Sequence, residues 1–417
     1  MSSIVIEGRK SLSGEISVSG AKNSVVALIP AAILCDEETS IDNVPNISDI
    51  DALEEILEYL HVDVKRKDHS IQICSKGMEN KEIPCELASR LRASYYFMGA
   101  MLGKYKKVSM CFPGGCSIGK RPINLHLKGF EKLGAKVIEE NDTFTIVADK
   151  LIGDEIFLDV PSVGATINII LAAVLAKGKT IIDNAAMEPE IIDVIHFLND
   201  MGAKIVGAGT RKLEIIGVDK LHSTHHRVVP DRIEAGTYVI IASLLGNHLK
   251  VSGLVPEHIE SLTSKLIEAG VKLDIGKNYV RVDEVGNYKA IDVQTVVYPG
   301  FPTDLQQPLV PFLTQCSGIS HVEETIYENR FQNVPDTVKM GANIKVFDNE
   351  IACIHGKTKL AGCEVVATDL RGGASMVICG LIADGTTTIT NVGHILRGYE
   401  DIVGKLSSVG ANIKIVD

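Results

Sequence analysis

Two kinds of helix are predicted by the spacing of apolar positions along this chain. One kind is amphipathic, with apolar residues at helical spacing and carboxylates between them, as in residues 50–60. The other kind is small or apolar almost all round, as in residues 165–176, 236–245 and 374–383. A helix without a polar face is typical of a protein interior, so we expect these helices to be buried. Pro30, inside the first of them, predicts a kink.

A short signature, in which Gly-Ala or a similar pair precedes a strand, follows each amphipathic helix. Its second position falls at residues 61, 134, 202, 270, 341 and 410, with His61 replacing the glycine in the first copy. The buried helices begin at the same interval of about 70 residues. Glycine after a helix is a common helix end. Each unit therefore reads as buried helix, strand, amphipathic helix, strand, turn and strand.

About 70 residues cannot enclose a helix that is apolar all round, so the six units are not six domains. Three units around a shared core make one domain of about 210 residues, and two such α/β domains account for the chain length. Residues 4–18 resemble residues 350–366, and the sixth unit lacks its last strands, so the N-terminal strands are expected to complete it. The expected domains are residues 21–229, and residues 1–20 with 230–417, which two chain crossings would join as a hinged pair.

Composition and charge narrow the class of protein. Apolar residues make up 45% and charged residues 23% of the sequence, which is ordinary for a folded globular protein. The longest apolar stretches are about half the length that spans a bilayer, and the N-terminus lacks a signal-peptide pattern, so we expect a cytoplasmic protein without membrane insertion. The net charge of −11 argues against nucleic-acid binding and requires local basic residues for any anionic substrate. The nine cysteines include no C-x-x-C pair, which predicts reduced thiols.

Polar and charged residues gather where the buried helices begin. They are Lys22, Asn23, Arg92, Ser94, Ser162, Gly164, Asp231, Arg232, Asp304, Asp369 and Arg371. If three-fold packing makes the helices of a domain parallel, their N-termini meet at one end, where unpaired N–H groups favour anions. The alternative is that Ser162 and Asp304 cap their helices and the other charges are solvated. The repetition at one structural position favours the anion site.

The glycine-rich loop at residues 113–122 is the sharpest local feature. It contains G-x-x-x-x-G-K, which is similar to a phosphate-binding P-loop. Arg121 stands where that motif needs Ser or Thr for Mg²⁺, so a P-loop is the weaker interpretation. Neighbouring cations make a thiol reactive, and Lys120 and Arg121 therefore favour a reactive Cys116 over a buried inert one. Cys111 is expected to point inward from the preceding strand.

Three histidines, His222, His225 and His226, are close enough in sequence to suggest a metal site. No Cys or carboxylate stands at a matching spacing, so a solvated loop is the favoured interpretation. We therefore expect no metal.

Eight blocks of sequence occur in the same order as in one enzyme family. They are residues 19–23 (SGAKN), 91–94 (LRAS), 113–122 (PGGCSIGKRP), 230–234 (PDRIE), 301–306 (FPTDLQ), 328–331 (ENRF), 367–371 (ATDLR) and 397–400 (RGYE). On these blocks, essentially along its whole length, the chain resembles the UDP-N-acetylglucosamine 1-carboxyvinyltransferases. The resemblance implies a two-domain inside-out α/β barrel of six βαβαββ-type repeats, as in the related 5-enolpyruvylshikimate-3-phosphate synthases.

The resemblance also implies a reaction. The enolpyruvyl group of phosphoenolpyruvate is transferred to the 3-hydroxyl of UDP-N-acetylglucosamine by addition and elimination, which releases phosphate in the first committed step of peptidoglycan synthesis. Cys116 would protonate the methylene carbon, or attack to form a covalent adduct, and fosfomycin-type epoxides would alkylate it. Asp304 would act as the base for the 3-hydroxyl or stabilise the charge that develops there. Lys22 and Arg397 would complete the catalytic set, and no metal or organic cofactor is implied.

Further residues are implied to bind the two small-molecule substrates. Lys22, Arg121 and Arg397 would hold the phosphate of phosphoenolpyruvate, and Arg371 its carboxylate, with Asn23 bonded to the sugar oxygen or the phosphate. The implied UDP-sugar site comprises Asn23, Arg92, Arg121, Pro122, Ile123, Asn124, Leu125, Ser162, Val163, Gly164, Asp304 and Ile326. Asp231 and Asp369 would support the arginines and the hinge. Because these groups come from both expected domains, the site would be complete only after closure.

Three features depart from the pattern expected of the family. Tyr95 and Tyr96 stand where many members carry a Trp, and Gly372 and Gly373 replace an expected Ala, which predicts a looser helix start. Residues 24–28 resemble the second of two paralogues found in some Gram-positive bacteria. Two other functions stay open: a synthase acting on shikimate 3-phosphate, and a non-catalytic paralogue that binds UDP-sugars and regulates a partner.

Overall fold

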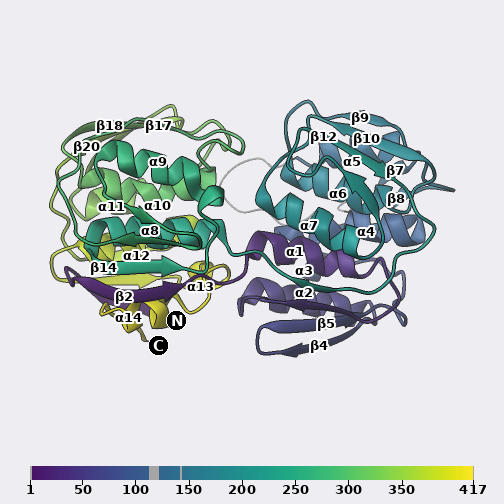
Figure 1. The fold of residues 1–417 in the computed structure, drawn as a ribbon, viewed down its shortest axis with the longest axis horizontal. Helices are drawn as coiled ribbons and strands as arrows, with labels where there is room; N and C mark the ends of the chain where they lie inside the picture. Colours follow the sequence, from purple (N-terminus) through teal and green to yellow (C-terminus); the bar gives the residue numbers. More distant parts are fainter. Residues whose placement is uncertain (1, 112–121, 141–142, 417) are drawn as a thin grey trace. The chain divides into compact units, whose positions relative to one another are not determined.

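The chain divides into two compact units. The computed structural model describes residues 2–111, 122–140 and 143–416. Of these, residues 20–111 and 122–229 belong to one unit, the central unit, and residues 2–19 and 230–416 form the other, the terminal unit. Each unit has its own apolar core. The described residues form six sheets, three in each unit, and the expected α/β class with buried helices is confirmed (Figure 1).

Three buried helices form the centre of the central unit. They are α1 (Lys22–Ala32), α4 (Tyr96–Tyr105) and α6 (Val163–Ala173), and α4 packs against both α1 and α6. The amphipathic helices are α2 (Ser48–Tyr59), α5 (Asn124–Lys132) and α7 (Pro189–Asp200). Two short helices, α3 (Cys85–Ala88) and η1 (Arg92–Tyr95), precede α4. Within α6 every residue from Gly164 to Ala173 is buried, because none of its faces is polar.

Two of the three described sheets of the central unit combine strands from different repeats, and the third is built from one repeat. The first has the order β13-β3-β5-β4, built from His225–Arg227, Thr39–Asp42, Ser70–Cys74 and Asp63–Lys67. The second, β6-β8-β7, contains Lys107–Cys111, Thr143–Val147 and Lys136–Glu140. The third, β11-β12-β10-β9, contains Lys204–Val206, Lys212–Ile216, Lys179–Asp183 and Glu155–Phe157.

The terminal unit repeats this plan. Its buried helices are α8 (Arg232–Leu245), α10 (Thr303–Thr314) and α12 (Leu370–Ile382), and all three pack against one another. Its outer helices are η2 (Pro256–Ile259), α9 (Glu260–Ala269), α11 (Val334–Lys339), α13 (Gly393–Leu396) and α14 (Ile402–Ser408). One sheet, β15-β16-β14-β2, contains Asp274–Ile275, Tyr279–Val282, Gly246–Ser252 and Leu12–Ser17. Another, β17-β18-β20-β19, contains Val293–Gln294, Gly318–Glu323, Ile351–Gly356 and Asn343–Phe347.

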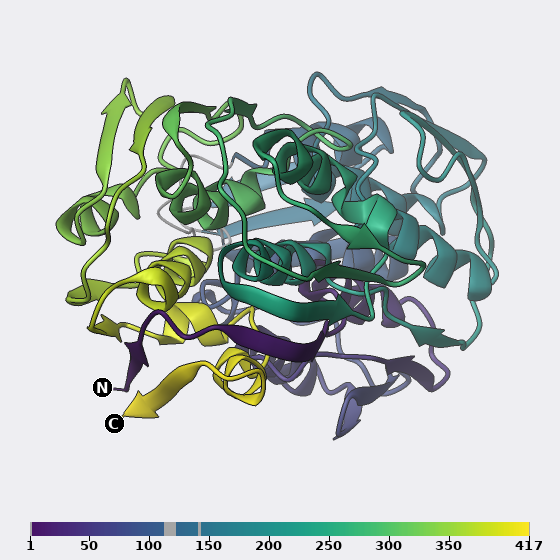
Figure 2. The same cartoon turned by 60° about the vertical axis from the view of Figure 1, so that its left-hand side comes forward.

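The N-terminal strand joins the sheet at the C-terminal end of the chain. That sheet, β21-β22-β1-β23, contains Glu364–Val366, Thr386–Thr390, Ser3–Glu7 and Asn412–Val416. Strand β1 runs antiparallel to both β22 and β23, with Ile4 opposite Ile415. Ile4 and Ile6 are fully buried, so the pairing is held by side chains as well as by backbone bonds. Figure 2 shows the two chain ends side by side.

Backbone conformation explains the glycine of the repeated signature. This position has φ between +94° and +111° at Gly134, Gly202, Gly270, Gly341 and Gly410. Side chains other than glycine are strained in this left-handed region. The first copy is the exception, since His61 adopts φ +59°. The signature therefore marks a left-handed residue that ends a helix and starts the next strand.

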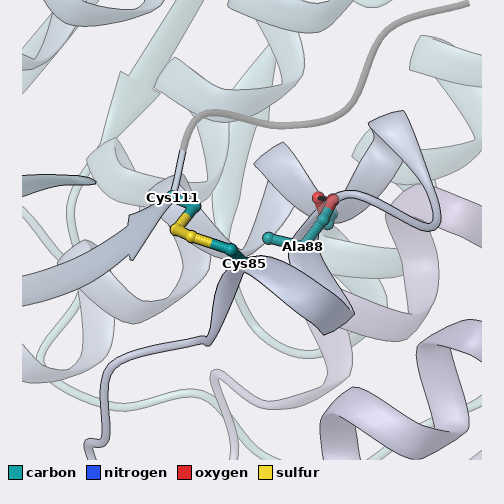
Figure 3. The surroundings of a disulfide bond; sticks show 4 residues. Cys85, Ala88 and Cys111 are labelled. Atoms are coloured by element: carbon teal, nitrogen blue, oxygen red, sulfur yellow. Dashed lines mark hydrogen bonds between the residues drawn. A yellow bond between two sulfur atoms is a disulfide. The ribbon is translucent and has the colours of Figure 1, made fainter. Parts of the chain in front are cut away.

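One pair of cysteines contradicts the prediction of reduced thiols. Cys85 and Cys111 form a disulfide, with Cα atoms 5.0 Å apart and a sequence separation of 26 (Figure 3). Cys111 is only 3% exposed, which confirms that it points inward. The two cysteines are distant in sequence, so no C-x-x-C motif marks them. A backbone bridge between Ile83 and Met110 brings their two segments together. The remaining described cysteines are free thiols.

A buried ion pair lies where the N-terminal segment meets α8 in the terminal unit. The Glu234 carboxylate accepts hydrogen bonds from Lys405 Nζ at 2.6 Å and from the Ser19 backbone N–H at 2.7 Å. Glu234 is 3% exposed, and burial raises the pKa of its carboxyl group from 4.5 to about 7, although Lys405 opposes that shift. This carboxyl group therefore makes stability depend on pH.

We predict that Glu234→Gln changes how stability varies with pH. Between about pH 4.5 and 7 the folded chain holds a proton on Glu234 that the unfolded chain has lost, so raising the pH through this window lowers the free energy of unfolding. The expected loss is on the order of 3 kcal/mol, and the glutamine variant lacks it. Urea unfolding of both proteins at several pH values measures the difference, and parallel pH profiles would contradict the prediction.

Candidate active site

The buried helices of the terminal unit begin close together, as three-fold packing predicts. Asp304 stands in the first turn of α10, and Arg371 in the first turn of α12. Their side chains meet, with Arg371 Nη2 donating to Asp304 Oδ2 at 3.1 Å. Asp231, which caps α8, lies close enough to act on the charge of Arg371. Charged side chains at the starts of α8, α10 and α12 therefore lie close together and form a charged cluster.

Asp304 is held between two buried arginines. Arg330 Nη2 donates to Asp304 Oδ1 at 2.6 Å, on the opposite oxygen from Arg371. The side chains of Arg330 and Arg371 are 3% and 4% exposed, whereas that of Asp304 is 28% exposed. Two guanidinium groups out of water need a partner of opposite charge, and Asp304 supplies it to both. The carboxylate also reaches solvent, so a ligand can approach it.

Arg371 stays charged in spite of its burial. Burial alone would lower the pKa of its guanidinium group, but Tyr399, Asp304 and Asp231 together raise it above the ordinary value. The guanidinium carbon lies 5.3 Å from the centre of the Tyr399 ring. The Tyr399 hydroxyl is in turn hydrogen-bonded to Thr237 at 2.9 Å. A fixed, buried guanidinium is suited to binding a carboxylate or a phosphate.

Two carboxylates at this site cap helices. Asp369 Oδ1 accepts from the backbone N–H groups of Arg371 and Gly372 at 3.0 and 3.1 Å, and its Oδ2 accepts from Gln307 at 3.0 Å. Asp231 accepts from Ile233 and Glu234 at 2.8 and 3.0 Å. Each cap fixes the start of a helix whose first turn lies at the charged cluster.

In the central unit, Lys22 begins α1 and pairs with a residue of α2. Lys22 Nζ lies 2.6 Å from Asp49 Oδ2, and the two side chains are 11% and 5% exposed. Asn23, the next residue, is half-buried. Ser162 caps α6 by accepting from the Ala165 N–H at 3.3 Å. The predicted cap at Ser162 is therefore present, and the ammonium group of Lys22 is held by a buried carboxylate.

Several residues from different repeats meet at the starts of α4 and α6. The guanidinium carbon of Arg92 lies 5.8 Å from the centre of the Tyr95 ring, and the Tyr95 and His126 rings meet edge to face at 5.0 Å. A side chain at Gly164 would lie 2.9 Å from both the His126 ring and the Tyr95 hydroxyl. This contact brings two implied UDP-sugar residues, Arg92 and Gly164, to one place. We call Arg92, Tyr95, His126 and Gly164 the ring cluster.

His126 is neutral in this cluster. Burial, and then the charge of Arg92, lower the pKa of its imidazole from 6.5 to about 3. The Asn168 carbonyl accepts from the Gly99 N–H at 2.8 Å, so the Asn168 amide nitrogen donates to His126 Nδ1 at 2.9 Å. The imidazole proton is therefore on Nε2, and the ring orientation is fixed from α6.

Comparisons with other proteins agree along the whole chain. The EPSP synthase (3-phosphoshikimate 1-carboxyvinyltransferase) family matches residues 6–406. UDP-N-acetylglucosamine 1-carboxyvinyltransferase 2 of Listeria monocytogenes is 50% identical over 98% of this chain and 97% of its own length. UDP-N-acetylglucosamine 1-carboxyvinyltransferase 1 of Streptococcus agalactiae is 49% identical over the full length of both chains.

The chain belongs to the UDP-N-acetylglucosamine 1-carboxyvinyltransferase family. The fold is also that of two more distant solved structures. The enolpyruvyl transferase NikO of Streptomyces tendae superimposes with a TM-score of 0.90 at 24% identity, over 100% of this chain and 99% of that one. EPSP synthase of Acinetobacter baumannii superimposes with a TM-score of 0.77 at 18% identity, over the full length of both. These two likenesses support the predicted two-domain barrel fold.

Two departures from the family pattern are now explained by packing. Tyr96 is 4% exposed and its ring meets that of Tyr95 edge to face at 4.6 Å, so the pair fills space with two rings in contact. The looser helix start expected from Gly372 and Gly373 is wrong. A side chain at Gly372 would lie 2.7 Å from Thr368 Oγ1, and one at Gly373 only 2.5 Å from Ile395, so α12 begins in a closely packed site.

The structure adds supporting residues that sequence reasoning missed. Glu324 is 3% exposed, and it accepts from the Thr303 hydroxyl at 3.0 Å and from the Ile326 backbone N–H at 2.9 Å. It thereby ties Ile326, whose side chain is exposed, to the start of α10. Asp49, Arg330 and His126 were missed too. Only Arg330 carried a signal, since it lies in one of the eight family blocks.

The other implied residues are placed by the helices that they begin or follow, and some lie outside the described residues. Arg397, half-buried, directly follows α13. Among Pro122–Leu125, Pro122 is exposed, Ile123 is 7% exposed, and Asn124 begins α5. Val163 begins α6. Cys116, Arg121 and the P-loop-like segment lie outside the described residues.

The three histidines of the 222–226 segment have separate partners. His225 Nε2 lies 2.7 Å from Asp42, and His226 Nε2 lies 2.8 Å from Asp193. His222 Nδ1 contacts the Ser223 carbonyl at 3.0 Å. Within the described residues no group of three or more metal-ligating side chains occurs, and no helix has the length and apolarity to cross a membrane.

We predict that Gly164→Ala destabilises the chain. The added methyl group would lie 2.9 Å from His126 and Tyr95, so it forces two fixed rings apart, at a cost of about 1–3 kcal/mol. Gly393→Ala is the matched control, because its methyl group would meet no atom within 4 Å. Urea unfolding of both variants measures the effect, and equal stabilities would show that the ring cluster gives way easily.

Proposed function

We propose that this chain transfers the enolpyruvyl group of phosphoenolpyruvate to the 3-hydroxyl of UDP-N-acetylglucosamine and releases phosphate, as the first committed step of peptidoglycan synthesis. The observation that carries the proposal is the buried, charged Arg371 beside the partly exposed Asp304. Relatives with this named activity, about half identical over nearly full length, supply the substrates. We place the enzyme in the cytoplasm, acting on small molecules and on no nucleic acid.

The reaction needs an acid, a base and cations. Cys116 protonates the methylene carbon of phosphoenolpyruvate, or adds to the substrate as a nucleophile. The 3-hydroxyl oxygen attacks the neighbouring carbon as Asp304 accepts its proton, giving a tetrahedral intermediate. Phosphate then leaves as the methyl group returns a proton to the Cys116 thiolate. Lys22, Arg121 and Arg397 hold the phosphate, since cations stabilise the charge that grows on a leaving oxygen.

Asp304 and Arg371 contact different substrate groups, the sugar 3-hydroxyl and the phosphoenolpyruvate carboxylate. Two ion pairs hold Asp304 as a carboxylate, the form that accepts a hydrogen bond from the sugar 3-hydroxyl. Arg371 also offers donors to the substrate carboxylate. An incoming carboxylate therefore competes with Asp304 for Arg371, while Arg330 keeps its bond to Asp304. Asp369 and Asp231 position these groups by capping α12 and α8.

The UDP-sugar is assigned to the central unit's ring cluster and neighbouring segments. The residues are Asn23, Arg92, Arg121–Leu125 and Ser162–Gly164, and the resemblance to the family adds Asp304 and Ile326. Arg92 supplies a positive charge to the diphosphate. Without such a local cation, the net charge of −11 would disfavour binding of this anion. The neutral His126 adds no charge and serves to position Tyr95.

We predict that the full-length chain releases phosphate only when both substrates are present, and that Cys116→Ala abolishes this release by removing the proton donor. A coupled phosphate assay measures both. Cys74→Ala is the control, because this thiol is free and half-buried and lies on β5. Wild-type turnover by Cys116→Ala would show that another group is the acid. Phosphate release with shikimate 3-phosphate would favour the alternative synthase, and binding without turnover would favour the non-catalytic paralogue.

We predict that Arg371→Lys weakens use of phosphoenolpyruvate selectively. Lysine keeps the charge but loses the planar fork that holds a carboxylate with two bonds. The expected fall in kcat/KM for phosphoenolpyruvate is about 10²-fold, with the Kd for UDP-N-acetylglucosamine changed by less than about threefold. Initial rates and calorimetric titration separate the two effects. Equal losses for both substrates would mean that Arg371 acts only by holding Asp304.

A further inference from the structure

The two sulfurs of the disulfide differ sharply in access. Cys85, the first residue of α3, is exposed, whereas Cys111 at the end of β6 is 3% exposed. A small thiol or disulfide in solution therefore reaches Cys85 more readily than Cys111. Among the described cysteines, Cys85 is the one that Cys111 is placed to react with. An exposed sulfur paired with a shielded one is the arrangement that stepwise thiol–disulfide exchange requires.

Backbone pairing keeps the two cysteines together without the sulfur–sulfur bond. The Ile83 N–H donates to the Ser109 carbonyl at 3.0 Å, and Ile83 forms a parallel bridge with Met110. Each of these residues lies within two positions of one of the cysteines. Ile83 and Met110 are both fully buried. After reduction the sulfurs would therefore stay near each other, ready to bond again.

The disulfide is connected to the ring cluster by one short helix. The carbonyl of Ala88, the last residue of α3, accepts a hydrogen bond from Ser94 Oγ at 2.8 Å, and Figure 3 shows Ala88 on the same helix as Cys85. Ser94 is fully buried and lies in η1 between Arg92 and Tyr95. A bond that holds Cys85 therefore also restrains the segment that carries these two side chains.

We propose that Cys85 and Cys111 form a reversible redox site that exchanges with low-molecular-weight thiols and disulfides, and that its oxidised form binds UDP-N-acetylglucosamine more tightly than its reduced form. The effect on UDP-N-acetylglucosamine binding rests on the proposed function. In the oxidising direction, the Cys85 thiolate attacks a small disulfide RSSR, forming a mixed disulfide and releasing RS⁻. The Cys111 thiolate then attacks the Cys85 sulfur and releases the second RS⁻. Two protein thiols are oxidised, one disulfide is reduced to two thiols, and the protons lost by the cysteines are taken up by the released thiolates.

Three of the other described cysteines are poorly placed to compete, whereas Cys74, Cys353 and Cys363 are half-buried free thiols. Cys35, Cys316 and Cys379 are buried. Burial raises the pKa of the Cys316 and Cys379 thiols to about 12, which disfavours the reactive thiolate. Cys74 is half-buried, free and in the same unit as the disulfide. Cys74→Ser is therefore the matched control for Cys85→Ser.

The exchange itself is tested without any assay of activity. The full chain carrying Cys116→Ser, which removes one further thiol, is equilibrated with mixtures of reduced and oxidised glutathione. Free thiols are then alkylated and the Cys85 and Cys111 peptides are quantified by mass spectrometry. We expect both peptides to change together and to return to the oxidised form after reduction. Failure of the disulfide to form again in the folded protein would overturn the redox site.

The effect on binding is tested by calorimetric titration of UDP-N-acetylglucosamine in the same Cys116→Ser background. We expect the Kd to rise at least threefold on reduction, both alone and with Cys74→Ser, and to be high in both conditions with Cys85→Ser. Equal Kd values for the oxidised and reduced protein would overturn the coupling. This comparison needs no cysteine variant at the disulfide, so misfolding of Cys85→Ser would not obscure it. Absence of binding in both states would overturn the proposed function and the coupling together, whereas the exchange titration judges the redox site separately.

Discussion

The structure depends on helices that have no polar face. A helix such as α6, buried from Gly164 to Ala173, must be covered on every side by other parts of the chain. One repeat of about 70 residues is too small to do this, so three repeats share one interior. In the terminal unit the result is three mutually packed helices, α8, α10 and α12. Their ends are then the only places on them where polar groups can stand without being buried in an apolar core.

This constraint explains why charge is concentrated at the helix starts. Asp231 and Asp369 satisfy N–H groups of the first turn, and Asp304 joins two helices by its bonds to Arg371 and Arg330. Buried ion pairs contribute little net stability, because removing charges from water costs about as much as the pairs return. The presence of these ion pairs at one place is better explained by a role in binding or catalysis than by a contribution to folding stability. The groups that hold the helices are also those that can hold an anion.

The comparisons separate what belongs to the fold from what belongs to the chemistry. An EPSP synthase and the enolpyruvyl transferase NikO, 18% and 24% identical, share the fold, whereas the relatives that are about half identical are UDP-N-acetylglucosamine 1-carboxyvinyltransferases. A fold of this kind carries more than one activity, so the argument for function must come from the site. In this chain the proposed function is supported by the charged groups around Arg371 and by the ring cluster around His126.

The sequence by itself determined the repeat, the buried helices and the helix starts that carry charge, because apolar periodicity and left-handed glycines act over a few neighbouring residues. It also indicated the family, through eight blocks spread over the chain. Only the tertiary structure decided which partners these residues meet: Arg330 with Asp304, Asp49 with Lys22, His126 with Tyr95, and Cys85 with Cys111. The partners come from different repeats or distant segments, so no local pattern records them. The protonation of His126 and the charge of Arg371 follow from burial and neighbouring charges, which exist only once the chain has folded.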